Sequence, residues 1–263
     1  MKNLIFACFL VVMVLGACKK KDPEPVLETF RGITETYQGK KIPLFEFSDP
    51  LTPQKVLYNA IISYQTGTVM IKMNYQLSYT ANQILSNAQI TNSPLGTPIS
   101  IDYTINAKNQ ITHTNAYGNR PNITYAYDQY NRLISSTADG FSSEYEYDIQ
   151  GRLNKITLKN QLGKKWLEVL VTCDDKINPL KKLPLAYLED DMPMWTWFSL
   201  SKHNITSLTY NDYNPSGSVT GTEKYVYTYS YDQDGKPLTM KRYYYPEFLK
   251  GDKGYYNEFI YNY

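Results

Sequence analysis

Apolar and polar residues alternate along most of the chain after residue 40, and the alternation breaks at short polar segments. Alternation with a period of two places apolar side chains on one face of a β-strand, because successive side chains point to opposite faces. Short polar breaks between such segments are typical of hairpins. The pattern predicts strands at 41–47, 56–63, 69–79, 203–210, 225–231, 240–245 and 258–263, in addition to those of the repeat described next.

One short phrase occurs twice near the middle of the chain and once more near its end. Residues 125–133 read YAYDQYNRL, residues 145–153 read YEYDIQGRL, and a weaker copy, YSYDQDGKPL, occupies 229–238. Tyrosines two apart share a strand face, and an aspartate after the strand can accept hydrogen bonds from the backbone N–H groups of a turn. Three residues later the loop needs a left-handed residue, a conformation that glycine and asparagine adopt at least cost. The predicted structural turn residues are Asp128, Asn131, Asp148, Gly151, Asp232 and Gly235.

These phrases belong to a longer period. If Tyr79, Tyr103, Tyr127 and Tyr147 are equivalent, their spacings are 24, 24 and 20 residues, which corresponds to one hairpin per repeat. Cys173 then takes the place of the next tyrosine. We predict that it is a core residue, since a free cysteine behaves as a small buried hydrophobe.

The predicted fold is therefore all-β: an antiparallel meander of these hairpins, curled into an open or barrel-like sheet. Residues 176–200 interrupt the pattern with three prolines, which predicts one short inserted loop or helix covering an end of the sheet. A sheet of this size must bury one face, so at least half of the 26 tyrosines are expected inside. Several charged strand residues are expected to face outward, and they are too numerous for an outer surface that contacts lipid. They are Lys155, Lys159, Glu223, Lys224, Lys241 and Arg242.

The N-terminal residues predict where the protein is located in the cell. Residues 1–17 have one positive charge followed by an apolar run too short for a membrane anchor, as in a secretory signal peptide. The sequence LGAC at 15–18 resembles a bacterial lipobox, which implies cleavage before Cys18 and its acylation. The alternative is a plain signal peptide with Cys18 unmodified. We predict a signal peptide at 1–17, a lipidated tether at 18–29 and a single β-domain at 30–263.

Residues that carry chemistry are few. Lysines and acids are interspersed and the formal net charge is +2, so no basic field points to nucleic acid. His113 and His203 are isolated, and no spacing predicts a metal site, a cofactor or a catalytic residue. The acids at 174–175 and 189–191 suit either a calcium site or, more simply, solvated loops.

Aromatic residues in the insertion are the predicted ligand-binding candidates. Trp195, Trp197 and Phe198 either stack on a ligand or cover the apolar face of the sheet. The three repeat aspartates have a catalytic alternative, as the carboxylates of a glycoside hydrolase, but equivalent positions in successive turns explain them structurally.

The phrase at 145–153 is similar to the YD repeats of Rhs-type shell proteins. Together with the lipobox, the chain resembles Bacteroidetes lipoproteins that carry a domain of unknown function with a porin-like fold, and the run DDKINPL at 174–180 is similar to a run in those families. The resemblance covers most of residues 60–263. It implies a curled antiparallel sheet and supplies no reaction.

We therefore expect a lipid-anchored protein of the bacterial outer membrane, on its periplasmic or surface face, that is a non-enzymatic binding or scaffold domain. The expected partners are the membrane, through Cys18, and a glycan or envelope protein. One alternative is a glycan-binding accessory lipoprotein that uses Trp195 and Trp197. Another is an envelope hydrolase that uses the turn aspartates.

Overall fold

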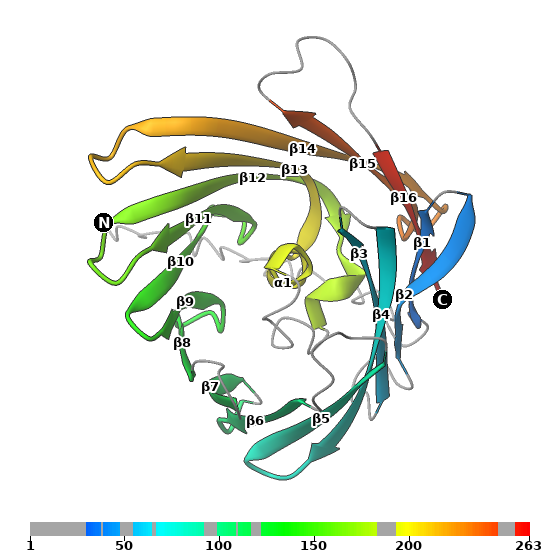
Figure 1. The fold of residues 1–263 in the computed structure, drawn as a ribbon, viewed down its shortest axis with the longest axis horizontal. Coiled ribbons are helices and arrows are strands. Elements are labelled where there is room, and N and C mark those ends of the chain that lie inside the picture. The colour runs from blue at the N-terminus through cyan, green and yellow to red at the C-terminus, as the bar shows by residue number, and fades with distance from the viewer. Residues whose placement is uncertain are drawn as a thin grey trace, which may run out of the picture.

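The chain forms one ring of strands around a short helix (Figure 1). The computed structural model describes residues 30–37, 39–47, 55–64, 67–91, 99–108, 110–116, 122–182, 193–246 and 256–263. Cys18 and the predicted signal peptide and tether lie outside these residues. So do the acids at 189–191.

Sixteen strands make up the ring. They are β1 (Gly32–Tyr37), β2 (Lys40–Phe47), β3 (Lys55–Tyr64), β4 (Gly67–Tyr79), β5 (Gln83–Thr91), β6 (Ile99–Ile105), β7 (Ile111–Ala116), β8 (Ile123–Tyr127), β9 (Leu133–Ala138), β10 (Phe141–Tyr147), β11 (Leu153–Lys159), β12 (Lys165–Ile177), β13 (His203–Tyr213), β14 (Val219–Tyr231), β15 (Pro237–Pro246) and β16 (Tyr256–Asn262). Between β12 and β13 lie a 3₁₀ helix, η2 (Pro179–Lys182), and an α-helix, α1 (Pro193–Leu200).

Each strand pairs antiparallel with its neighbours in sequence, and β16 pairs with β1, so the meander closes into a barrel. The predicted all-β meander with one short inserted helix is confirmed. Among the described residues, no helix has the length and apolarity needed to cross a membrane.

Because the chain is a meander, its connections alternate between the two ends of the barrel. The repeat turns at 128–132, 148–152 and 232–236 lie at one end, which we call the YD end, and both Phe30 and Tyr263 lie there as well. The turns at 139–140, 160–164 and 214–218 lie at the other end, which we call the mouth. The insertion between β12 and β13 starts and finishes at the YD end, and α1 lies inside the ring (Figure 1).

The inner face of the barrel is apolar and the outer face is charged. Tyr145 pairs with Ile156, and Ile156 with Val169, and all three side chains are buried. On the opposite face of the same strands, Lys155 forms an ion pair with Glu146 at 2.6 Å. Similar pairs join Lys159 to Glu144 and Lys241 to Glu258. The alternation seen in the sequence therefore separates an apolar interior from a charged exterior.

Two of the charged residues expected outside face inward instead. Glu223 shares a strand face with Tyr225 and the buried Tyr227, and Arg242 lies opposite Tyr227. The guanidinium carbon of Arg242 is 5.5 Å from the centre of the buried Phe259 ring. The expectation was wrong for a geometric reason: adjacent residues of a strand point to opposite faces, so Lys224 and Lys241 cannot share a face with Glu223 and Arg242.

The repeat tyrosines join one hairpin to the next. The backbone ladder between β9 and β10 ends at the pair Ser135–Glu144, before the YD end is reached. Beyond it, the Tyr147 hydroxyl donates to the Leu133 carbonyl oxygen at 2.9 Å. The same bond recurs at equivalent positions: Tyr127 to Ile111 at 2.7 Å, Tyr263 to Pro237 at 3.0 Å, and the Cys173 thiol to Leu153 at 3.7 Å. A side chain thus continues the connection where the backbone ladder has ended.

Candidate functional site

The insertion between β12 and β13 is held in place by one buried side chain, Asn178. Its amide nitrogen donates to the carbonyl oxygens of Phe198 and Ser201, and its side-chain oxygen accepts from the backbone N–H of Leu180 at 2.9 Å. Asn178 therefore connects η2 to the end of α1. Because buried polar groups are costly unless they are hydrogen-bonded, this set of bonds fixes the helix relative to the barrel wall.

The predicted ligand-binding aromatics all lie on α1, and all are buried. Trp195 and Phe198 are 5% and 1% exposed. Trp195 makes edge contacts with Phe45 and Phe259, with ring centres 5.2 and 5.4 Å apart, while Phe198 makes one with Tyr227 at 5.0 Å. Such edge-to-face contacts are characteristic of an aromatic core. These two side chains are therefore part of the aromatic core and are not exposed to a ligand.

Trp197 is placed differently, because it borders a pocket of about 200 Å³ between α1 and the barrel wall. Three inward-facing residues of the wall there are unusually small: Ser136, Ala138 and Ser143. The register pairs Ser136 with Ser143 and Ala138 with Phe141, where other parts of the wall carry tyrosine, leucine or isoleucine. The space that these small side chains leave is the pocket. It is lined by Ile123, Ser136, Thr137, Ala138, Phe141, Ser142, Ser143, Tyr145, Leu158, Lys159, Trp166, Thr196 and Trp197.

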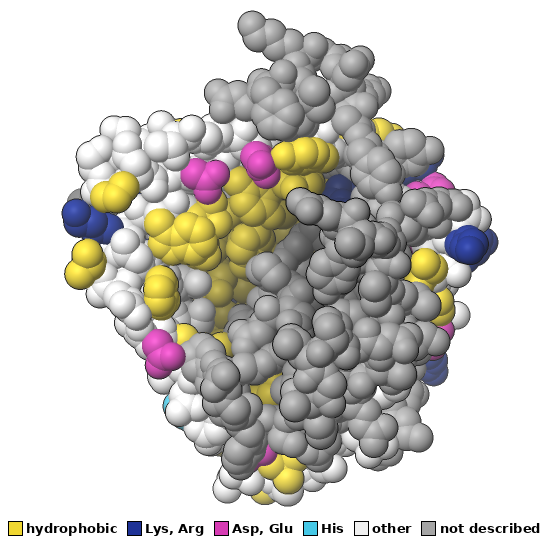
Figure 2. Space-filling view, in the orientation of Figure 1, with side chains coloured by type: hydrophobic (Ala, Val, Ile, Leu, Met, Phe, Trp, Pro, Cys, Tyr) yellow, Lys and Arg dark blue, Asp and Glu magenta, His cyan; other side chains and the backbone are white. Residues whose placement is uncertain are grey.

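The pocket combines aromatic rings with hydroxyl groups. Trp166 and Phe141 are partly exposed at the mouth end, whereas Tyr145 and Trp197 lie deeper. The Lys159 ammonium is paired with Glu144, so its charge is compensated. Figure 2 shows hydrophobic side chains gathered on the part of the inner wall that is in view, beside a hollow. An aromatic and hydroxyl lining suits a small, uncharged ligand with both apolar and polar groups.

The turns around the mouth hold the pocket edge together. The Gln161 side chain donates to the carbonyl oxygen of Asp139 at 3.2 Å, which joins the turn after β9 to the turn after β11. The Lys164 ammonium donates to the carbonyl oxygen of Pro215 at 3.3 Å and joins the next turn along. Sequence reasoning missed Trp166 and the small residues, because their importance depends on which strands become neighbours.

The repeat aspartates are used within their own turns. Asp148 Oδ1 accepts from the backbone N–H groups of Gln150 and Arg152, both at 2.9 Å, and Oδ2 accepts from the Arg152 guanidinium. Burial raises the pKa of Asp148, but these hydrogen bonds outweigh burial and hold the pKa below its usual range. Gly151 has φ of 78°, the left-handed conformation that the turn needs.

The other two copies have the same geometry. Asp128 accepts from Tyr130 and Arg132, with Asn131 at φ of 64°, and its pKa is lowered in the same way. Asp232 accepts from the backbone of Asp234 and Lys236, with Gly235 at φ of 78°. Each carboxylate thus belongs to a separate turn, and the structure brings no two of them together for acid–base catalysis.

Other candidates from the sequence have local partners. Nε2 of His113 lies 2.8 Å from Asn115 Oδ1, and the Tyr231 hydroxyl donates to Asp174. Among the described residues, no three His, Cys, Asp or Glu side chains converge to hold a metal. Cys173 is half-buried, with its sulfur 3.3 Å from the Ser201 hydroxyl.

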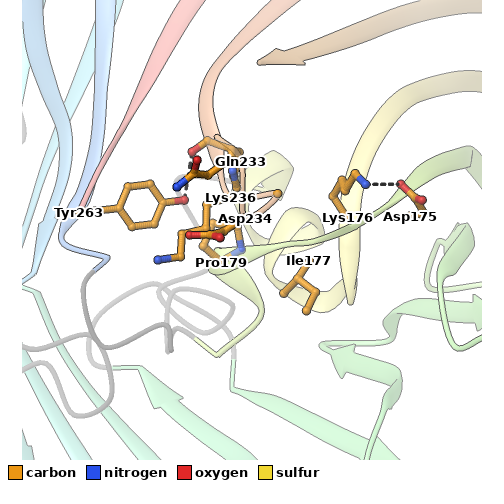
Figure 3. Close-up of a pocket in the computed structure, with 10 residues that line it drawn as sticks. Asp175, Lys176, Ile177, Pro179, Gln233, Asp234, Lys236 and Tyr263 are labelled. Carbon is orange, nitrogen blue, oxygen red and sulfur yellow. Dashed lines mark hydrogen bonds and ion pairs between the residues drawn. The ribbon is translucent and has the colours of Figure 1, made fainter. Parts of the chain in front are cut away.

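A second pocket, of about 280 Å³, lies at the YD end (Figure 3). It is bordered by the end of β12, the turn before β15 and Tyr263. Its charged groups have opposite signs and lie close together, as in the ion pair of Lys176 and Asp175 at 3.6 Å. This mixture of compensated charges favours no ligand class, so the pocket beside Trp197 is the stronger candidate.

Comparison with known proteins supports the fold. No protein-family model matches the chain, and no curated protein matches it in sequence. Among solved structures, it is similar to a porin-like protein from Bacteroides uniformis, with 15% identity, a TM-score of 0.58, and coverage of 88% of this chain and 95% of that one. A porin-like protein from Bacteroides vulgatus has 13% identity and a TM-score of 0.44, over 90% and 98% of the two chains. The expected porin-like fold is confirmed by the similarity to the Bacteroides uniformis structure.

Proposed function

We propose that this chain is a lipid-anchored, non-enzymatic binding protein of the bacterial outer membrane, whose ligand enters the barrel from the mouth and occupies the pocket beside Trp197. The observation that carries the proposal is the pocket itself. A gap of about 200 Å³ lies between α1 and the barrel wall where Ser136, Ala138 and Ser143 are small. Trp166 and Trp197 line that gap.

The position of the chain ends agrees with an anchor at Cys18. Phe30, the first described residue, packs on Tyr261 and Tyr263 at the YD end, with ring centres 6.0 and 5.7 Å apart. A tether at 18–29 would therefore join the barrel at the YD end and leave the mouth facing away from the membrane. The charged outer face favours a barrel that stands in water beside the bilayer.

The anchor is tested by fractionation. Wild-type protein is expected in the membrane fraction, to be released by detergent and to be acylated, while a Cys18→Ala variant is expected in the soluble fraction. If the variant remains in the membrane fraction, the anchor proposal is wrong. The ligand pocket would be unaffected by that outcome.

The pocket is tested by filling it. Ala138→Leu adds a bulky side chain on the inner face, and Ala126→Leu makes the same change at an exposed position on the neighbouring strand β8. The probes are neutral mono- and disaccharides and small uncharged aromatic alcohols, followed through the fluorescence of Trp166 and Trp197. We expect binding by the wild type and the Ala126 variant, and none by the Ala138 variant. No binding, or binding by all three, would refute the proposed site.

Glycan binding is the second candidate, and the lining favours it for a specific reason. Two tryptophans can stack on the apolar face of a sugar ring, while the hydroxyls of Ser136 and Ser143 lie within the same pocket. In this second candidate, Trp166 takes the place of Trp195 as the partner of Trp197, because Trp166 and Trp197 line the same pocket. Saccharide binding that survives loss of both Trp166 and Trp197 would exclude it.

A further inference from the structure

Aromatic rings continue from Trp197 across the inner wall of the barrel as a strip of three tyrosines. Tyr210 on β13 lies 5.7 Å from Trp197, Tyr225 on β14 lies 5.5 Å from Tyr210, and Tyr244 on β15 lies 4.8 Å from Tyr225, measured between ring centres. The register places Tyr225 directly opposite Tyr244. All three tyrosines are partly exposed. We call these residues the tyrosine strip.

Carboxylates accompany the strip on the same face. Glu223 lies two residues before Tyr225, directly opposite Tyr210, and forms a side-chain hydrogen bond with Tyr244. Asp212 is exposed and lies two residues after Tyr210, nearer the mouth. Its Oδ2 atom is 3.5 Å from the position that a Cβ atom would take on Gly221. In Figure 2, acidic side chains border the hydrophobic inner wall. The strip is thus an aromatic surface with negative charge at its edge.

The positive charge on this wall lies deeper and is engaged. Arg242 donates from Nη2 to Asn257 Oδ1 at 2.9 Å, and the Asn257 amide donates in turn to the buried Glu35. Arg242 also packs on the Phe259 ring. The Arg242 guanidinium is thus held by Asn257 and Phe259 below the strip, and Glu223 and Asp212 add negative charge above it.

We propose that the tyrosine strip and Glu223 bind an organic cation with an apolar surface, such as a trimethylammonium group. The faces of tyrosine rings carry partial negative charge, which attracts a cation that has lost part of its water shell. A nearby carboxylate adds a direct Coulomb attraction. An anion would meet Glu223 and the ring faces, both unfavourable. This goes beyond the proposed pocket beside Trp197 and does not depend on its ligand.

A pair of isosteric probes separates charge from shape. Choline and 3,3-dimethylbutan-1-ol have the same size, but the quaternary nitrogen of choline is replaced by carbon in the alcohol. The full-length chain is kept in a polyoxyethylene detergent, which has no choline headgroup, and binding is followed by saturation-transfer NMR. We expect choline to bind about 3- to 30-fold tighter than the alcohol, the range of cation–π attraction.

Two substitutions locate the effect. Glu223→Gln keeps the side-chain shape and a hydrogen-bond acceptor for Tyr244, and is expected to lower choline affinity several-fold without changing that of the alcohol. Glu258→Gln, on the outer face beside Lys241, is the matched control and should change neither. The Ala138→Leu variant should still bind choline, which separates this site from the proposed pocket.

The proposal fails if choline and the alcohol bind equally, if choline does not bind at millimolar concentration, or if Glu223→Gln leaves choline affinity unchanged. Should the Glu223 variant fail to fold, the comparison of the two probes on the wild type decides by itself.

Discussion

The tyrosine bonds between successive hairpins make a quantitative prediction about stability. Tyr147→Phe removes one hydroxyl and keeps the ring, so that the Arg132 guanidinium, 4.8 Å from its centre, still has an aromatic partner. The lost bond joins Tyr147 to the Leu133 carbonyl oxygen at 2.9 Å, beyond the end of the β9–β10 ladder. The substitution therefore tests the bond itself and leaves the packing of the ring in place.

The expected loss follows from the usual net value of a partly buried hydrogen bond. One such bond contributes about 0.5–1.5 kcal/mol to the free energy of unfolding. For a domain of this size that corresponds to a fall in Tm of about 1–6 °C. Tyr127 and Tyr263 make the equivalent bond. Tyr263 follows β16, many strands away from β9 and β10, so its effect should add to that of Tyr147. Tyr127 lies directly opposite Leu133, so its effect is expected to be coupled to that of Tyr147. A triple Tyr→Phe variant should lose about 1.5–4.5 kcal/mol.

The assay is urea unfolding of the full-length chain, followed by tryptophan fluorescence. Tyr130→Phe is the control, because its ring is 69% exposed at the tip of a turn, and it should change the unfolding free energy by less than about 0.5 kcal/mol. If the triple variant is as stable as the wild type, the repeat tyrosines do not stabilise the barrel as links between hairpins, and the reasoning is refuted.

Three further predictions concern the turns and the insertion. The Asp148 pKa is lower in the folded than in the unfolded chain. The stabilisation that the ionised Asp148 carboxylate gives the fold is therefore complete above the unfolded pKa of about 3.9 and disappears as pH falls through the folded pKa. The difference in unfolding free energy between wild type and Asp148→Asn should shrink below pH ~4, and a difference independent of pH would contradict this. Gly151→Ala should cost about 1–2 kcal/mol, because φ is 78° there, and Gly221→Ala, which has no positive φ, should cost less in the same urea titration. Asn178→Ala should lower Tm by several degrees, because about 1–3 kcal/mol is lost for each buried group left unpaired; an unchanged Tm would show that Asn178 does not hold α1.

The turns were predictable from sequence because each depends only on residues close together in the chain. The aspartate, the left-handed residue and the basic residue after it lie within five positions, and the structure has the same geometry in all three copies. The same turn also occurs at the mouth with asparagine in the aspartate position, at Asn160 and Asn214. Neither was recognised as a copy of the repeat turn, because the surrounding residues do not repeat the tyrosine pattern.

Cys173 shows how much of the structure the sequence repeat could predict. Its thiol lies where the repeat puts a tyrosine hydroxyl, facing the carbonyl oxygen of Leu153. The repeat in the sequence predicted that Cys173 occupies a tyrosine position. The contact of its thiol with Leu153 could be recognised only once the pairing of β11 with β12 was known.

The amino-acid sequence by itself determined the hairpins, their turns and the meander, because these follow from side-chain alternation and from interactions within a few residues. Only the tertiary structure decided what lies inside the barrel. Closure through β1 and β16, the entry of α1 into the ring, and the pocket at Ser136, Ala138 and Ser143 all depend on which strands become neighbours. The inward side chains of Glu223 and Arg242 follow from alternation within β14 and β15, whereas the tyrosine strip arises only from the registers that place Tyr210, Tyr225 and Tyr244 side by side on three strands.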